Sequence, residues 1–221
     1  MPRSATAWRL ALAVVVATFV SIGNRSANAQ AEIVDLPVSS GGTERVLFIA
    51  APQPRATVVL LSGGSGLLAI DNAGNVQPGG NFVVRTRGLW APQGFAALLP
   101  GPPNGASLLG TRHGPSYLAA LGAVIDYARS RVDAPVWLIG TSQGSTGAAN
   151  GAAHLAPKVA GVVLTSSVTR AGRAHETVFD ADPRSRCRRW SSAIQAIIAS
   201  SALPATGPGC SPPSPARPAR S

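Results

Sequence analysis

The stretch VWLIGTSQGSTGAA, from Val136 to Ala149, constrains the fold of this chain more than any other. An apolar run leads into the pentapeptide G-T-S-Q-G, and a run of small residues follows it. A serine between Gly140 and Gly144 fits a sharp strand-to-helix turn, because small neighbours let other segments approach a strained backbone closely. The stretch therefore predicts a buried strand, a tight turn that presents Ser142, and a helix.

Strand-like apolar segments recur along the chain with turn residues between them. They are RVLFIAA from Arg45, ATVVLLSG from Ala56, GFAALLP from Gly94, PVWLIG from Pro135 and VAGVVLTSS from Val159. Several are apolar at every position, as expected of strands covered on both faces in a parallel sheet. Between them, residues 117–131 place Leu118, Leu121, Ile125 and Ala128 on one side of a helix. The alternation predicts one α/β domain with a mostly parallel sheet and helices on both faces.

A second glycine-rich segment, VVLLSGGSGLL, also runs from a predicted strand into a loop. Its spacing matches neither G-x-x-x-x-G-K-[ST] nor G-x-G-x-x-G, so a phosphate-binding loop is a poor interpretation. Together with the GTSQGS turn, the segment resembles the α/β-hydrolase superfamily, in particular secreted bacterial hydrolases with a glycine-rich oxyanion loop. The resemblance covers roughly residues 46–182. It implies that Ser142 is a nucleophile, and that backbone N–H groups of Gly64 or Ser65, together with Gln143, bind a developing oxyanion.

The resemblance also implies a catalytic acid and a histidine base, which follow the serine in the order Ser, acid, His. Asp180 and Asp182 lie just past the last apolar segment of the body, and His175 lies shortly before them. Of the other histidines, His113 precedes the predicted helix and, like His175, could lie at the carboxyl edge of the sheet, where ligands bind. His154 lies twelve residues along a helix from the serine, a rise of about 18 Å, and is expected to be a helix-end residue. We therefore name Asp180 and His175 as candidates for the acid and the base.

The first 29 residues have the pattern of a secretory signal peptide. Arg3 and Arg9 precede an apolar run, and the small triplet Ala27-Asn28-Ala29 follows it. The run from Leu10 to Ile22 is shorter than the ~20 residues that span a bilayer, so an uncleaved anchor is the weaker alternative. We expect cleavage after Ala29, export to the periplasm or the extracellular space, and no membrane contact of the mature chain.

The formal net charge of +10 is carried by the two ends of the chain. The leader holds three arginines and the stretch after residue 182 holds six, without any acidic residue. The body holds the remaining ten of the 19 basic residues and all nine acidic residues, so its charges nearly cancel. A nearly neutral body offers no basic face for a phosphate backbone, so we expect no nucleic-acid partner.

The composition changes abruptly after residue 182, and residues 183–221 form a low-complexity tail rich in Arg, Pro and Ser. We expect this tail to be disordered or translated out of frame, and to lack the last strands of the sheet. When the possible codons of Pro183–Ile197 are translated in a shifted reading frame, the product must contain an apolar run. It can have the sequence AIAVPTLVVSNSGD, which looks like a further strand followed by an acid. The tail also holds Cys187 and Cys210, which an exported protein could pair.

These expectations divide the chain into a signal peptide (1–29), an incomplete α/β-hydrolase domain (30–182) and a tail (183–221). They predict an exported, esterase-like serine hydrolase that acts on a small-molecule ester or acyl substrate, without a cofactor or a metal. The alternative is a catalytically incompetent truncated hydrolase, which would serve at most as a binding module.

Overall fold

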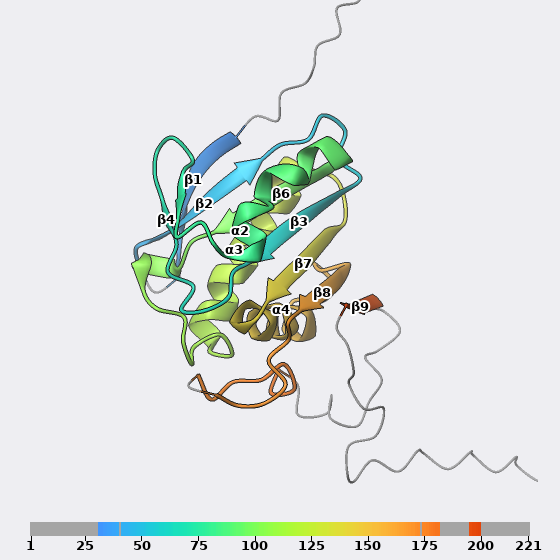
Figure 1. The fold of residues 1–221 in the computed structure, drawn as a ribbon. Helices are drawn as coiled ribbons and strands as arrows, with labels where there is room; N and C mark the ends of the chain where they lie inside the picture. Colours follow the sequence, from blue (N-terminus) through green and yellow to red (C-terminus); the bar gives the residue numbers. More distant parts are fainter. Residues whose placement is uncertain (1–30, 40, 173, 182–194, 200–221) are drawn as a thin grey trace, which may run out of the picture.

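The structure is a computed structural model, and it describes residues 31–39, 41–172, 174–181 and 195–199. Its centre is a seven-stranded sheet in the order β1-β2-β6-β3-β7-β8-β9 (Figure 1). The strands are β1 (Ala31–Pro37), β2 (Thr43–Ile49), β3 (Ala56–Leu61), β6 (Phe95–Pro100), β7 (Val136–Thr141), β8 (Gly161–Thr165) and β9 (Gln195–Ala199). β1 and β2 are antiparallel to each other, β2 is antiparallel to β6, and all other pairs are parallel.

The remaining elements connect the strands or cover the sheet. The α-helices are α2 (Phe82–Arg85), α3 (Pro115–Arg131) and α4 (Gln143–His154). Short 3₁₀ turns are η1 (Arg87–Leu89), η2 (Ala91–Gln93) and η3 (Pro103–Gly105), and β4 (Ala69–Ile70) pairs with β5 (Val76–Gln77) in a separate hairpin. No helix within the described ranges is long and apolar enough to cross a membrane.

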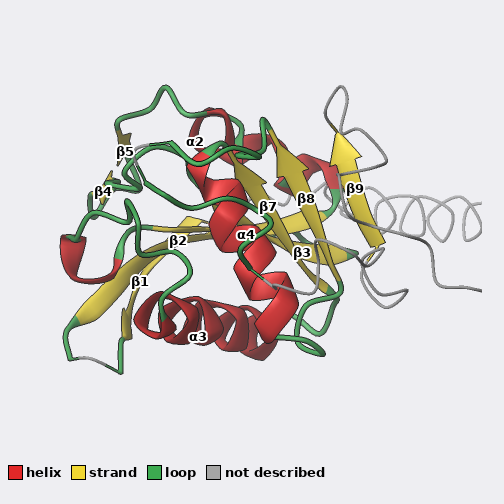
Figure 2. Cartoon of the chain, turned by 90° about the horizontal axis from the view of Figure 1, so that it is seen from below, coloured by secondary structure: helices red, strands yellow, loops and turns green. Residues whose placement is uncertain are grey.

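All five predicted strands are present, and the reason for their continuous apolar sequence is visible in the layers. Successive side chains of a strand point to opposite faces, so Val59 and Leu61 pack toward α3 and α4, whereas Val58 and Leu60 pack on the face of α2. Figure 2 shows α3 below the sheet and α2 above it. The prediction of an α/β fold with both faces of the sheet covered is therefore confirmed.

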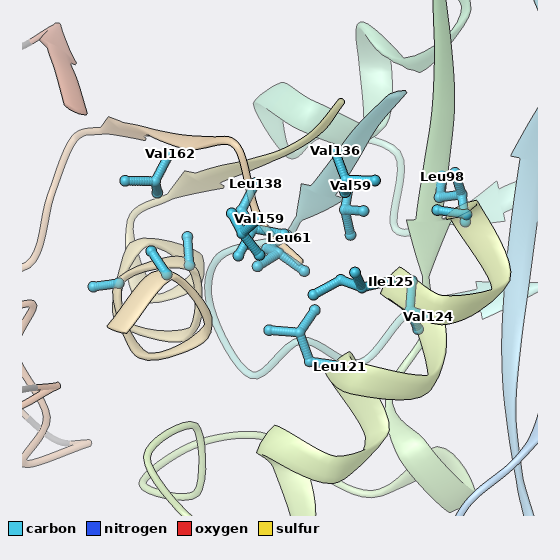
Figure 3. Packing of buried hydrophobic residues seen from close by; sticks show 14 of the residues in the cluster. Val59, Leu61, Leu98, Leu121, Val124, Ile125, Val136, Leu138, Val159 and Val162 are labelled. Carbon is cyan, nitrogen blue, oxygen red and sulfur yellow. The ribbon is translucent and has the colours of Figure 1, made fainter. Parts of the chain in front are cut away.

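The predicted helix forms α3, and its buried face is centred one residue earlier than the sequence indicated. Leu121, Ile125 and Ala128 are buried as expected, but Leu118 is only half-buried and Tyr117 takes its place. Gly147 of α4 makes this possible, because a Cβ atom there would collide with Tyr117 Oη. Figure 3 shows the α3 side chains next to the strand residues that they contact. Each fully buried Val, Leu or Ile contributes roughly 1.5–3 kcal/mol.

Two strands of the sheet were not expected. β1 is an edge strand with mostly half-exposed residues, so its apolar pattern is weaker than that of the central strands. β9 lies in the stretch for which we expected no strand, and it runs parallel to β8 with Gly161 opposite Gln195. Its sequence, QAIIA, contains a run of four apolar residues, which is too short to be distinguished from a helix by pattern. The signal peptide, Asp182, both cysteines and most of the predicted tail lie outside the described residues.

Candidate active site

Ser142 occupies the turn between β7 and α4 with a backbone conformation that side chains rarely adopt. Its φ is 51° and its ψ is −126°. Such angles cost on the order of 1–3 kcal/mol in a residue other than glycine, so the surroundings must hold them. The Ser142 N–H donates to Thr165 O at 3.0 Å, and Ser142 O accepts from Ser145 N and Oγ at 2.9 and 2.6 Å. The turn leaves the Ser142 side chain exposed at the carboxyl end of the sheet.

The turn is packed so closely that three glycines have no room for a side chain. A Cβ atom on Gly140 would collide with Gly144 O, and one on Gly144 would collide with Leu61 O at the end of β3. A Cβ atom on Gly63 would lie 2.9 Å from both Ser142 Cβ and Thr141 O. Such contacts are well inside van der Waals separation. The two glycine-rich motifs of the sequence therefore meet, and the loop after β3 lies directly beside the serine.

The backbone of the glycine loop forms a tight turn and leaves several N–H groups without an acceptor among the described residues. Gly64 has a φ of +62°, and Gly66 N donates to Gly63 O at 3.3 Å, so residues 63–66 form a tight turn. Gln143 is the first residue of α4, where backbone N–H groups have no acceptor within the helix. The N–H groups of Gly64, Ser65 and Gln143 donate to no other described residue. They are available to an external acceptor near Ser142.

A strained serine at the end of a central parallel strand, followed at once by a helix, has the backbone geometry of a nucleophile elbow. The fold is of the α/β-hydrolase type. Within it, Ser142 and Gln143 lie at the turn between β7 and α4, Gly64 and Ser65 lie in the loop after β3, and their chemical roles stay predictions.

Arg112 stabilises the glycine loop on the side away from Ser142, a role that no sequence pattern predicted. Its side chain is only 1% exposed, and its guanidinium donates to Leu108 O, Ser62 O and Gly64 O at 3.0, 3.2 and 3.1 Å. Burial lowers the pKa of this guanidinium. Asn150 Nδ2 of α4 donates to the Arg112 carbonyl at 2.8 Å, which fixes the arginine from the other side. Arg112 thus links the glycine loop to the helix that follows the nucleophile.

Two further ionisable side chains are buried next to Arg112. Glu44 of β2 is 3% exposed, and desolvation raises the pKa of its carboxyl to about 8. Burial also raises the pKa of Tyr117. All three side chains border a small cavity behind the glycine loop, between β2 and α3. Glu44 Oε2 has no hydrogen-bond partner in the part of the chain that the structure describes, so the neutral acid is the favoured form at pH 7.

The candidates for acid and base lie on the loop that follows β8. Asp180 Oδ2 accepts from Thr177 N and Thr177 Oγ1, both at 2.8 Å. His175 is exposed and has a φ of 53°, and its N–H donates to Gly172 O at 3.0 Å. Neither side chain hydrogen bonds to Ser142, and no other described histidine or carboxylate does. The structure thus shows no hydrogen bond that joins either candidate to the serine, and their roles remain predictions.

The other two histidines serve the local structure. The His113 N–H donates to Glu176 Oε1 at 3.1 Å, which joins the loop before α3 to the loop after β8. Within the described residues, His113 Nε2 and Glu176 Oε2 are buried without a partner. His154 is the last residue of α4, as predicted, and its Nδ1 lies 3.1 Å from Asn150 O. The described ranges contain no group of three His, Cys, Asp or Glu residues that could hold a metal ion.

Comparisons with known proteins give only distant similarities. No protein-family model matches the chain, and no curated protein matches its sequence. Among solved structures, it is similar to an esterase from Pyrococcus furiosus (15% identity, TM-score 0.48), over 66% of this chain and 53% of the other. It is similar to brefeldin A esterase, a bacterial homologue of human hormone-sensitive lipase (16%, 0.47), over 76% and 52%. A serine hydrolase without lid from Xanthomonas campestris matches at 16% identity and a TM-score of 0.48, over 67% and 66%. The matched region spans about half the length of the first two proteins.

Proposed function

We propose that this chain is a serine hydrolase that cleaves a small-molecule ester through an acyl-enzyme on Ser142. The observation that carries the proposal is the exposed, conformationally strained serine, which lies beside three backbone N–H groups that have no acceptor among the described residues. A nucleophile and preorganised donors on one side of it are the two parts that acyl transfer requires.

The reaction proceeds in two steps. Ser142 Oγ attacks the carbonyl carbon of the ester and loses its proton to a base, and the carbonyl oxygen becomes negatively charged. The N–H groups of Gln143 and of Gly64 or Ser65 bind this oxygen, and removal of one such donor typically costs about 10²–10³ in rate. The alcohol then leaves with a proton, and water releases the acid from Ser142 in the second step.

His175 and Asp180 are the residues of the described part that we propose as base and orienting acid. They lie on one loop, which Glu176 and Ser145 attach to the elements around Ser142. His175→Gln and Asp180→Asn are each expected to slow hydrolysis. Rates equal to that of the wild type would exclude the residue concerned.

Export is the second part of the proposal, and it rests on the sequence of residues 1–29. N-terminal sequencing of protein from the exported fraction is expected to begin at Gln30. A mature chain that still carries Trp8 would contradict the signal-peptide assignment.

The test of the enzymatic proposal is hydrolysis of p-nitrophenyl butyrate by the full chain. Ser142→Ala is expected to lower kcat/KM by at least about 10³, because the covalent step is lost. Ser130→Ala is the matched control, since Ser130 lies near the end of α3, where its Oγ donates to Tyr127 O. Folded protein that shows no hydrolysis above that of Ser142→Ala would contradict the proposal and support the alternative of a module that only binds.

A further inference from the structure

Asn81 lies at the candidate active site, although it is about sixty residues from Ser142 in the sequence. It precedes α2, and its Nδ2 faces the glycine loop. A methyl group placed on Gly63 would lie 3.3 Å from Asn81 Nδ2 and 2.9 Å from Ser142 Cβ. The amide and the nucleophile therefore border the same small space beside Gly63.

The orientation of the Asn81 amide is determined by its role as the N-cap of α2. Its Oδ1 accepts a hydrogen bond from the Val83 N–H at 3.1 Å. Because a backbone N–H only donates, the atom that caps the helix must be the oxygen, and the nitrogen must point the other way. Val83 and Val84 are fully buried against the sheet, so the turn that carries Asn81 is anchored.

The Asn81 Nδ2 group has no acceptor among the described residues. An amide nitrogen carries two N–H groups, and neither donates to a described neighbour. Asn81 is half-buried, so its amide stays open to a molecule bound at Ser142. The hydrogen bond from Val83 N–H to Asn81 Oδ1 fixes the position of the amide, and the two N–H groups on Nδ2 remain free.

We propose that Asn81 is an additional hydrogen-bond donor of this site, and that its Nδ2 binds the acyl oxygen of the substrate beside Ser142. The inference rests on the proposed function, and it adds a side-chain donor to the backbone donors of Gln143 and of Gly64 or Ser65. A charge-developing oxygen binds a preorganised donor more tightly than the neutral carbonyl does, so the amide favours the acylation step.

Two substitutions separate the donor from the helix cap. Asn81→Asp keeps the acceptor that caps α2 but has no N–H, and Asn81→Ser keeps a capping hydroxyl without adding charge. The rate of labelling by an alkyl fluorophosphonate is measured, since its phosphoryl oxygen takes the place of the acyl oxygen. We expect both variants to label at least about tenfold more slowly, with an unfolding midpoint equal to that of the wild type.

Asn72→Asp is the matched control, because Asn72 lies in the turn between β4 and β5 and accepts from Arg45. It is expected to label at the wild-type rate. If Asn81→Ser also labels at that rate, the donor role is overturned, whether or not Asn81→Asp is slow, because charge alone would explain the slow Asp variant.

A second measurement tests Asn81 even if Ser142 does not react, which separates failure of this inference from failure of the proposed function. In ¹⁵N spectra of the full chain, the side-chain amide of Asn81 is the pair of signals that Asn81→Ser removes. Titration with butyrate, the acid released from a butyryl ester, is expected to shift this pair in a saturable way. No shift at saturating butyrate, with the chain folded, would overturn the inference.

Discussion

The elbow at Ser142 and the loop after β8 both contribute to one edge of the sheet, but they are held in different ways. Around Ser142, backbone packs on backbone so closely that Gly63, Gly140 and Gly144 cannot carry a side chain. The described residues of the segment 166–181 include two non-glycine residues with positive φ, Ser166 and His175, and hydrogen bonds and local turns hold this segment. Steric contact fixes the candidate nucleophile, whereas polar contacts fix the loop that carries the candidate acid and base.

The largest expected difference between the two regions concerns their glycines. A Cβ atom on Gly144 would collide with Leu61 O and lie 2.7 Å from Ser62 O, whereas one on Gly172 would meet nothing within 4 Å. Gly144→Ala is therefore expected to lower the free energy of unfolding by more than about 4 kcal/mol or to prevent folding. Gly172→Ala should change it by less than about 0.5 kcal/mol. Denaturant unfolding measures both, and a tolerated Gly144→Ala would refute the close packing.

Buried and exposed arginines give the next contrast. Arg112→Met removes three hydrogen bonds from a charged donor, one of them to the buried Ser62 carbonyl, so we expect a loss of about 3 kcal/mol in stability. Fluorophosphonate labelling should slow as well, because the glycine loop loses its support. Arg170→Met, in the exposed part of the loop after β8, should leave both quantities unchanged. Equal effects of the two substitutions would contradict the assigned role of Arg112.

Glu44 should make the region behind the glycine loop sensitive to pH. Its pKa is about 8 in the folded chain and near 4.5 when unfolded, so the folded state holds the proton more tightly. Its contribution to stability is complete below pH 4.5 and is lost as the pH rises toward 8. The free energy of unfolding should fall by roughly 2 kcal/mol between pH 6 and pH 8. Glu44→Gln should remove most of this dependence in urea unfolding curves, and a variant with the full wild-type dependence would exclude Glu44 as its source.

Ser145 connects the two regions, and its loss should have the smallest effect. Its Oγ donates to Ser142 O and accepts from Val168 N at 3.2 Å. Ser145→Ala leaves one half-buried N–H without its acceptor, so a loss of about 1 kcal/mol is expected. Hydrogen exchange at the Val168 amide should accelerate while that of α3 stays slow. Unchanged exchange at Val168 would show that this link does not hold the loop.

The sequence predicted the elements whose causes are local. The central strands follow from continuous apolar runs, and the turn at Ser142 follows from the small residues within two positions of it. The role of Arg112 was not predicted, because its acceptor Ser62 is fifty residues away. A contact between residues so far apart leaves no pattern in a single sequence. The N-cap role of Asn81 could have been predicted, because an asparagine directly before an apolar run is a typical helix N-cap. Its proximity to Gly63 required the folded chain.

The central claim is that the turn between β7 and α4 presents Ser142 as the nucleophile, and mapping of the phosphonylated residue tests it most directly. The full chain is treated with a fluorophosphonate and digested, and the modified peptide is identified by mass spectrometry. We predict one adduct, on Ser142, which is absent from Ser142→Ala although that variant keeps its unfolding midpoint. An adduct on another serine, or an unmodified Ser142 in folded protein at excess reagent, would contradict the account.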